Sequence, residues 1–491
     1  MTARSPRVLA AALAAALAGG CSGDWGRPHK APGSAAWLPR GGALDAPTLE
    51  RLRRAGIGEL FVPAARLEWN GDRPVLRAER LDGLPPRAPV TLVVDGVWPE
   101  GELDADQAGE RLAAELGKLL LAAESRGLAP LGVHLDITDA GESESYPAAL
   151  AEARGELGRD AFLSATLARG EWEGEAAERL ARSVDFLVAF LYGQRAEEPD
   201  SAAAWDLGRI EPQLAVLDRL KRGYLVALST VGSATRLTAA GEPLASSTAV
   251  SLRALVAEPG LALRQGFELL SGARLVHVFQ VIEPARLAGW DLRPGESVRV
   301  VRTHGAYLED VAERLGSRPS RHRLGEVYHR LPAPGERLVL PTESLLAARA
   351  PGRAAPQLEV ALELIERAPR RLRLRVRLEN RSAESTDLAL LNHNYVELNA
   401  TGALFVRADA GTFQRYQLRR RGVEELTFRT ARTADQLRLH LPVLEGRDSA
   451  ASGPLELRLT GGEPSLVVAS RFLLPDGREA GTPPTPWRPP G

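Results

Sequence analysis

Short apolar runs alternate with longer helical patterns between residues 35 and 305. The runs are continuously apolar, which is typical of strands buried on both faces of a parallel sheet. The segments between them, such as 105–126 and 201–221, repeat apolar residues at helical spacing with charged residues opposite. The eight predicted strands are Ala35–Pro39, Glu59–Pro63, Val90–Asp95, Leu131–Asp136, Ala161–Thr166, Val184–Tyr192, Tyr224–Ser229 and Arg274–Gln280.

This alternation of strands and helices predicts an α/β fold, a (β/α)8 TIM barrel, over residues 35–315. A doubly wound open sheet is the alternative, but no Gly-x-Gly-x-x-Gly motif follows the first strand to support a nucleotide fold. The segment Arg66–Arg77 has Asn70-Gly71 at its middle, which predicts a β-hairpin inserted after the second strand.

The hydrophobic period changes to strict alternation from residue 357 onwards. The run from Leu372 to Leu378 alternates leucine or valine with arginine, as expected of a strand with one solvated face. Further short strands separated by Gly, Asp and Pro turns predict an all-β sandwich over 357–477. We expect 316–356 to be a connecting segment and the Pro-rich tail 478–491 to be disordered.

The first 21 residues have the pattern of a secretory signal peptide. Two arginines precede an apolar run, Val8–Ala18, which is too short to span a bilayer. The sequence Leu17-Ala18-Gly19-Gly20-Cys21 resembles a bacterial lipobox, although the family prefers a branched aliphatic residue where Ala18 stands. We therefore expect Cys21 to be acylated, residues 22–34 to be a flexible tether, and the protein to be exported. It would be anchored to a bacterial membrane and face the periplasm or the cell surface. An ordinary secreted protein with an incidental cysteine is the alternative.

The amino-acid composition limits the partners and the chemical groups that the protein can use. The 491 residues contain 62 Lys+Arg and 63 Asp+Glu, and this near balance argues against a nucleic-acid partner. Cys21 is the one cysteine, which excludes disulfides, cysteine-ligated zinc and Cys-x-x-Cys redox chemistry. His134, His277 and His304 lack the spacing of a metal motif, so we predict neither a metal nor another cofactor. Any chemistry must come from carboxylates, histidines and hydroxyls.

Polar residues at the carboxyl ends of TIM-barrel strands face the mouth where active sites lie. The predicted catalytic carboxylates there are Asp95, Asp136 and Asp139. The predicted substrate-binding side chains are His134, Trp98, Tyr192, Gln194, Gln280 and Glu283, and the hydroxyls of Thr166, Ser229 and Thr230 lie at the same level. Aromatic rings beside carboxylates and amides form a lining suited to sugars, whose apolar faces stack and whose hydroxyls need acceptors.

The fourth predicted strand, Gly132–Asp139, resembles the signature strand of chitinase-type glycoside hydrolases, which carry Asp-x-x-Asp-x-Asp-x-Glu there. Phe190-Leu191-Tyr192 is similar to the Met-Tyr-Asp of that family. The chain also resembles an uncharacterised family of exported bacterial TIM-barrel proteins. Its motifs correspond here to Gly132–Thr138, Tyr146–Leu150, Leu163–Leu167 and Arg330–Arg337.

The departures from the chitinase-type pattern concern the acid. If Asp136 matches the inner aspartate, Thr138 stands in place of the acid Glu and His134 in place of an earlier Asp. A threonine cannot protonate a leaving oxygen, so chitinase-like substrate-assisted hydrolysis is not implied. Asp136 could instead pair with another mouth carboxylate, among which we count Asp95, Asp139, Glu142 and Glu283. The alternative is that Asp136 and His134 only form hydrogen bonds inside the barrel top.

Each of two charged clusters can be explained either by ligand binding or as an ordinary solvated surface. Asp136, Asp139, Glu142 and Glu144 could bind Ca²⁺ but lack the glycine spacing of a dedicated loop, so a solvated loop is favoured. The arginines on one face of the strand, Arg371, Arg373, Arg375 and Arg377, could contact phosphates of an anionic glycan, although such a row is more often the wet side of a sheet.

The sequence thus predicts a lipid-anchored cell-envelope protein with a glycoside-hydrolase-like TIM barrel that binds or cleaves a glycan. It leaves open whether the protein is an enzyme; if it is, we expect a carboxylate mechanism of the glycoside-hydrolase kind. The alternative is a non-catalytic structural or interaction lipoprotein that uses the barrel as a scaffold, because the fold alone does not fix the function.

Overall fold

The computed structural model describes most of the chain beyond the predicted tether. The described residues are 33–99, 103–138, 143–157, 161–167, 174–191, 207–264, 268–270, 274–350, 356–389, 393–421, 434–461 and 463–488. Cys21, the predicted signal peptide and residues 22–32 lie outside them, so the lipid anchor stays a prediction. Within these ranges no helix is long and apolar enough to cross a membrane.

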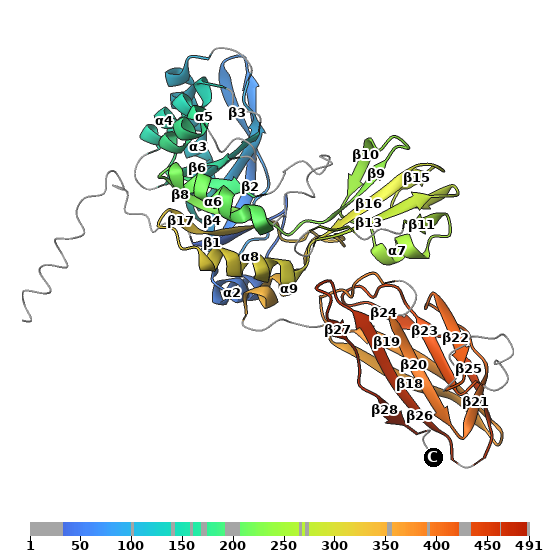
Figure 1. Cartoon of the computed structure of the whole chain (residues 1–491). Helices are drawn as coiled ribbons and strands as arrows, with labels where there is room; N and C mark the ends of the chain where they lie inside the picture. Colours follow the sequence, from blue (N-terminus) through green and yellow to red (C-terminus); the bar gives the residue numbers. More distant parts are fainter. Residues whose placement is uncertain are drawn as a thin grey trace, which may run out of the picture.

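Eight parallel strands close into a barrel, which confirms the predicted (β/α)8 fold (Figure 1). β1 pairs with both β2 and the last strand, β17, and these two pairings close the sheet. In order around the barrel the strands are β1 (Ser34–Trp37), β2 (Ile57–Asn70), β4 (Pro89–Val97), β5 (Ala129–Thr138), β6 (Phe162–Leu167), β7 (Phe186–Phe190), β8 (Gly223–Ser229) and β17 (Arg323–His329).

Helices cover the outside of the barrel. They are α2 (Ala46–Arg54), α3 (Ala105–Ser125), α4 (Ser145–Glu156), α5 (Glu175–Ser183), α6 (Leu207–Arg219), α8 (Gly305–Ser317) and α9 (Thr342–Arg349). α3 follows the predicted pattern over 105–126: Leu112 and Leu116 face the barrel, and the carboxylate of Asp104 accepts a hydrogen bond from the N–H of Gln107. The predicted hairpin is also present, because β2 continues to Asn70 and pairs with β3 (Arg73–Ala78).

The prediction that Arg274–Gln280 is the eighth barrel strand is wrong. This segment belongs to β13 (Arg274–Val281), in an antiparallel sheet inserted between β8 and α8 with the order β10-β9-β16-β13-β11. The inserted elements are β9 (Ser233–Leu237), β10 (Pro243–Ser247), α7 (Leu252–Ala257), β11 (Leu261–Leu263), β12 (Glu268–Leu270), β13, β14 (Ala285–Leu287), β15 (Trp290–Leu292) and β16 (Ser297–Arg302).

The true eighth strand, β17, lies in the segment 316–356 that was expected to be a connector. Its apolar run is broken by Glu326, which accepts a hydrogen bond from the Ser34 hydroxyl at 2.6 Å and lies 3.5 Å from Arg349 of α9. A strand whose charge is paired in this way lacks the continuous apolarity that identified the other seven. The barrel therefore extends to Arg349 rather than to residue 315.

Two antiparallel sheets form the predicted all-β sandwich. One has the order β18-β19-β25-β21 with β24 beside β19, and the other has the order β22-β23-β20-β26-β27 with β28 beside β26. Alternate residues such as Leu374, Val376 and Leu398 are fully buried between them. The strands are β18 (Leu358–Ala368), β19 (Arg371–Asn380), β20 (Tyr395–Thr401), β21 (Ala403–Arg407), β22 (Arg415–Arg419), β23 (Gln436–His440), β24 (Ser449–Ala451), β25 (Leu455–Leu459), β26 (Ser465–Leu473), β27 (Glu479–Ala480) and β28 (Thr485–Trp487).

Two details of the sandwich differ from or refine the sequence prediction. The expectation of disorder from residue 478 is wrong as far as residue 488, because β27 and β28 both pair with β26. Pro486 is tolerated there because β28 lies at a sheet edge, where the missing N–H is not needed. The arginine row is a solvated face: Arg371 and Arg373 form ion pairs with Glu366 of the neighbouring strand.

The sandwich completes the core of the inserted sheet. Leu388 and Val443, from two sandwich loops, are buried in the same cluster as Phe279 of β13 and Val298 of β16. The carboxylate of Glu445 accepts hydrogen bonds from the Ser251 hydroxyl and the N–H of Leu252, at 2.9 and 2.8 Å, where α7 begins. These contacts join the insertion to the sandwich. The chain itself joins it to the barrel, because the insertion lies between β8 and α8.

Candidate active site

A pocket of about 420 Å³ opens at the carboxyl ends of β1, β2, β4, β5 and β17. Asp95 on β4 and Asp136 on β5 are direct neighbours in the parallel register, so both carboxylates come to the same level of the mouth. The pocket is lined by Trp37, Leu38, Pro39, Arg40, Pro63, Val93, Asp95, Asp136, His329, Arg330 and Ala333.

Asp95 has a cation beside it. Arg40 lies two residues beyond Leu38, in the loop that follows β1. Its guanidinium forms ion pairs with both Asp95 and Glu79. The Asp95 side chain is about one quarter exposed, so the pair is partly shielded from water. An opposite charge in contact stabilises an ionised carboxylate.

Asp136 ends a chain of hydrogen bonds that runs down into the barrel. Its Oδ1 accepts a hydrogen bond of 2.6 Å from the hydroxyl of Thr166 on β6. Oγ1 of Thr166 lies 3.0 Å from Nε2 of His134, and Nδ1 of His134 lies 3.0 Å from Oγ of Ser164. The Ser164 hydroxyl also lies 3.4 Å from the carbonyl oxygen of Val133. Asp136 is therefore connected through one hydroxyl to a buried imidazole, whereas Asp95 is in contact with a guanidinium.

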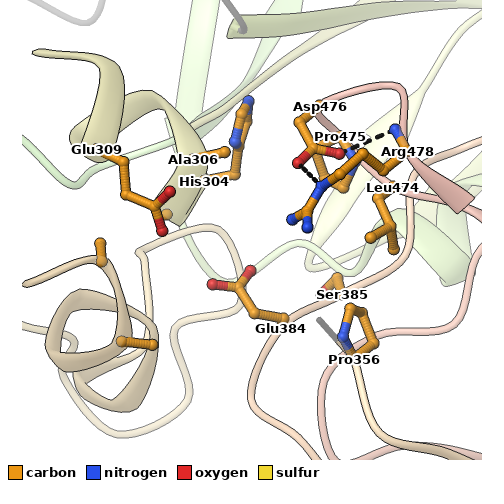
Figure 2. A pocket seen from close by; sticks show the side chains of 13 residues that line it. His304, Ala306, Glu309, Pro356, Glu384, Ser385, Leu474, Pro475, Asp476 and Arg478 are labelled. Carbon is orange, nitrogen blue, oxygen red and sulfur yellow. Dashed lines mark hydrogen bonds and ion pairs between the residues drawn. The ribbon is translucent and has the colours of Figure 1, made fainter. Parts of the chain in front are cut away.

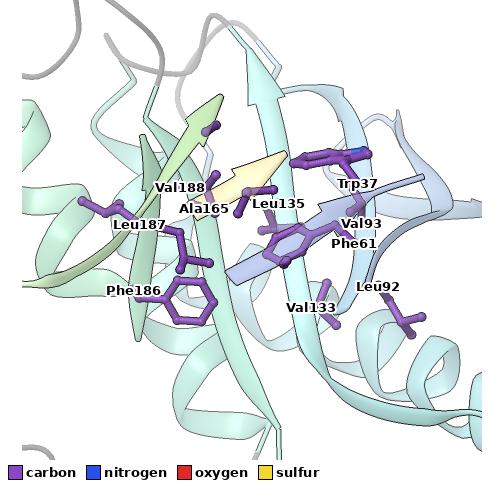
Figure 3. Close-up of a cluster of buried hydrophobic side chains, with 14 of the residues drawn as sticks. Trp37, Phe61, Leu92, Val93, Val133, Leu135, Ala165, Phe186, Leu187 and Val188 are labelled. Atoms are coloured by element: carbon purple, nitrogen blue, oxygen red, sulfur yellow. The ribbon is translucent and has the colours of Figure 1, made fainter. Parts of the chain in front are cut away.

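His134 lies below the pocket, fully buried among aromatic rings. Trp37 and Phe61 stack on one another at 5.4 Å (Figure 3). Each of the two rings also meets the imidazole of His134 in an edge-to-face arrangement at 5.4 Å. Burial, with a smaller contribution from His329, lowers the pKa of His134 to about 3. The ring is thus neutral at physiological pH, and it supports Asp136 from beneath where direct contact with a substrate was expected.

Other predicted residues lie elsewhere. Trp98 is buried: its indole N–H donates to the Ser145 hydroxyl at 3.1 Å, and its ring lies between Trp69 and Tyr146. Gln280 and Glu283 do not follow the eighth barrel strand as predicted, because their segment belongs to the inserted sheet. There the Gln280 amide donates to the Glu296 carbonyl at 2.9 Å, and Glu283 is exposed. Asp139, Tyr192 and Gln194 lie outside the described residues.

Three basic side chains of the pocket were not predicted. Arg40 follows the first strand, and His329 and Arg330 end the strand that the sequence pattern missed. Burial, followed by the charge of Arg330, lowers the pKa of His329 to about 3. Arg330 forms two hydrogen bonds to Glu336, at 2.6 and 2.5 Å. The sequence signal that could have located these residues is the segment Arg330–Arg337. It is one of the motifs that resemble the exported TIM-barrel family, and it begins directly after β17 ends.

A second, much smaller cavity of about 30 Å³ lies between α8, α9 and the sandwich (Figure 2). Glu309, Glu384 and His304 line it, together with Asp476, whose carboxylate lies 2.5 Å from Nε of Arg478. Burial raises the pKa of Glu384 above its usual value. Nowhere in the described part of the chain do three or more histidines, aspartates and glutamates form a group suited to a metal ion. The barrel mouth remains the better candidate, because its two carboxylates lie side by side in different surroundings.

Comparison with protein-family models gives no match, and comparison with curated proteins gives none either. Among solved structures, the spore cortex-lytic enzyme SleL of Bacillus cereus aligns at 16% identity and a TM-score of 0.42, over 65% of this chain and 74% of that one. The chitinase ChiA74 of Bacillus thuringiensis aligns at 8% identity and a TM-score of 0.40, over 89% and 99% of the two chains.

A family GH18 chitinase of Chromobacterium violaceum aligns at 12% identity and a TM-score of 0.37, over 90% of this chain and 91% of that one. Two of these three structures are named as chitinases and the other as a spore cortex-lytic enzyme. Identities and TM-scores this low do not assign an activity, so the residues of the site must indicate one.

Proposed function

We propose that this protein is an exported envelope protein whose barrel mouth binds and cleaves a glycan between Asp95 and Asp136. The observation that carries the proposal is the pairing of two neighbouring carboxylates in unlike surroundings, one against Arg40 and one on the Thr166–His134 chain. Enzymes separate acid and base roles between two carboxylates in this way.

In the proposed mechanism Asp136 is the residue that carries the proton and Asp95 is the residue that stays ionised. Asp136 would protonate the leaving oxygen, because Thr138 has no carboxyl to do so. Asp95, held ionised by Arg40, would stabilise or attack the sugar carbon. The separation of the two carboxyl groups decides the stereochemical outcome: about 5–5.5 Å gives retention of configuration and about 6.5–9.5 Å gives inversion.

The test is hydrolysis of N-acetylglucosamine oligosaccharides and peptidoglycan glycan strands by the purified protein. Asp136→Asn should lower kcat/KM by about 10²–10⁴-fold, and Asp95→Asn should also cause a loss. Glu283→Gln is the matched control: it removes an exposed carboxylate on the inserted sheet and should change nothing. Equal activity of Asp136→Asn and the unmodified protein would refute the site.

A non-catalytic glycan receptor is the second candidate. It is favoured because Thr138 stands where the chitinase-type enzymes that the sequence resembles carry their acid Glu. In that case calorimetry would detect glycan binding that Asp136→Asn weakens, while no glycan of the panel is cleaved.

We also propose that Cys21 carries the lipid that holds the protein on the envelope. The lipobox-like sequence before Cys21 supports this. Metabolic labelling with a radioactive fatty acid should mark the full chain and not the Cys21→Ser variant. Labelling of both would place the lipid elsewhere.

A further inference from the structure

The hydrogen-bond chain below Asp136 has the same members whichever way its hydrogens point. We propose that it has two states, in which the protonation state of Asp136 sets the tautomer of His134: Nε2–H beneath the carboxylate and Nδ1–H beneath the carboxylic acid. This inference rests on the proposed function for its role in catalysis, where Asp136 must give up and regain a proton.

The first state follows from the 2.6 Å bond between Thr166 and Asp136. A carboxylate only accepts, so the Thr166 hydroxyl donates to Oδ1 of Asp136. That hydroxyl has one hydrogen, so at its other contact it accepts from Nε2–H of His134. Nδ1 then carries no hydrogen and accepts from the Ser164 hydroxyl. Every buried polar atom of the chain is satisfied.

The second state reverses each bond. Protonated Asp136 donates to Thr166, whose hydroxyl now donates to Nε2 of His134, and Nδ1–H donates to Oγ of Ser164. The Ser164 hydroxyl turns to the carbonyl oxygen of Val133, 3.4 Å away. The one added proton comes from the pocket and resides on Asp136. His134 keeps a single proton, which is exchanged from Nε2 to Nδ1, and each hydroxyl keeps its own hydrogen and rotates.

Because the hydrogen-bond chain is buried, changing the tautomer of His134 costs less free energy than keeping one tautomer in both states of Asp136. If His134 kept Nε2–H while Asp136 donated to Thr166, the Thr166 hydroxyl would face two donors and have no acceptor within the chain. Thr166 is 4% exposed and His134 is fully buried, so water cannot take the lost place cheaply. His134 is therefore a positioning residue, which keeps both forms of Asp136 hydrogen-bonded.

Several charged or titratable groups surround this chain. Asp95 faces Asp136 from β4 with Arg40 against it, and Arg330 lines the same pocket. His329 approaches His134 from β17, and both rings are neutral because burial holds each pKa near 3. Glu59 on β2 accepts a hydrogen bond from Thr91 deeper in the barrel, and burial raises its pKa to about 7. From β6 the neighbours are hydroxyls, and from β7 they are apolar side chains such as Phe190.

The test is nitrogen NMR of the whole protein labelled with ¹⁵N-histidine, followed from pH 8 to pH 4. The two ring nitrogens of each tautomer have distinct shifts, and the signals of His134 are assigned by their loss in His134→Gln. We expect the Nε2–H tautomer at high pH and a neutral Nδ1–H tautomer at low pH, each in at least about tenfold excess. Thr166→Val removes the linking hydroxyl and should leave one tautomer throughout.

Two controls separate other causes. Thr91→Val removes a buried barrel hydroxyl that does not touch His134, and Glu59→Gln removes the titration of Glu59; the switch should survive in both. A tautomer that stays constant in the unmodified protein, or an imidazolium at low pH, would overturn the inference. This readout needs no glycan, so a working switch in a protein that neither binds nor cleaves glycans would reject the proposed function alone.

Discussion

The part of the chain that the structure describes contains two buried histidine–aspartate pairs, one in the barrel and one where the inserted sheet meets the sandwich. In the barrel, Thr166 links His134 to Asp136 through short hydrogen bonds. At the junction, Nε2 of His277 lies 3.9 Å from Oδ1 of Asp387, and Nη1 of Arg302 lies at the same distance from that oxygen. Burial lowers the pKa of each histidine to about 3, so both rings are neutral.

The difference between the pairs lies in access and in the partner. Asp136 borders an open pocket and contacts a hydroxyl, so a proton can come and go. Asp387 is sealed between two parts of the molecule, 6% exposed, with Arg302 as a permanent cation. The same two residue types therefore support chemistry in the first region and docking in the second.

The largest effect on stability is expected at the junction core. Leu388 is 1% exposed and packs in the core of the inserted sheet. Leu388→Ala should lower the free energy of unfolding by about 2–5 kcal/mol, because it leaves a cavity. Denaturant unfolding followed by tryptophan fluorescence measures this. Leu121→Ala, at an exposed leucine of α3, is the control and should cost little. If Leu388→Ala cost as little as Leu121→Ala, the sandwich would not complete the core of the inserted sheet.

Removal of Arg302 should cost about as much, and its cost should depend on pH. Arg302→Leu removes the cation beside the buried Asp387 carboxylate. We expect the free energy of unfolding to fall by about 3–5 kcal/mol at pH 7.5. Burial raises the pKa of Asp387 to about 6 from 3.8. A raised carboxyl pKa means that stability from this group is full below pH 3.8 and is lost as the pH rises through 6. The cost of Arg302→Leu should therefore shrink at pH 5, and a cost independent of pH would contradict the assignment.

Glu59→Gln should stabilise the barrel, in contrast to the two junction variants. Glu59 is 4% exposed and burial raises its pKa to about 7 from 4.5, although the bond from Thr91 opposes the shift. Its stabilising contribution is present below pH 4.5 and lost as the pH rises through 7. Gln keeps the shape without the charge, so the gain should be on the order of 1–3 kcal/mol at pH 8. We expect no gain at pH 4.5, and a gain that is the same at both values would exclude Glu59 as the titrating group.

The smallest effect is expected on the solvated face of the sandwich. Arg371 is exposed and forms ion pairs with Glu366 and Glu456. Arg371→Ala should leave the free energy of unfolding almost unchanged, because exposed pairs are weak. If this variant instead abolished binding of an anionic glycan, the arginine row would be a binding surface and not only the wet side of a sheet.

The sequence predicted the barrel and the sandwich because their strands follow simple periods. Seven barrel strands are continuously apolar, and Leu372–Leu378 alternates strictly. The eighth strand escaped because Glu326 is neutralised by Arg349, which lies more than twenty residues further on and cannot be inferred from a local pattern. The apolar run of β13 misled because an inserted sheet buries its central strand just as a barrel does.

The site was predictable only where a residue's position followed from its strand. Asp95 and Asp136 end correctly identified strands, and they meet in the pocket. Trp98 was misjudged because packing against Trp69 and Tyr146 turns it away from the mouth. Arg40 and the role of Thr166 depend on side-chain contacts across strands, which the sequence order does not specify.

The most direct measurement of the central claim is a crystal structure of the protein with an oligosaccharide from the tested panel. We predict that sugar density lies within hydrogen-bond reach of both Asp95 and Asp136, in the pocket that Arg40 and Arg330 also line. Density confined to the inserted sheet around Gln280 or to the sandwich would contradict the assignment of the barrel mouth as the glycan site.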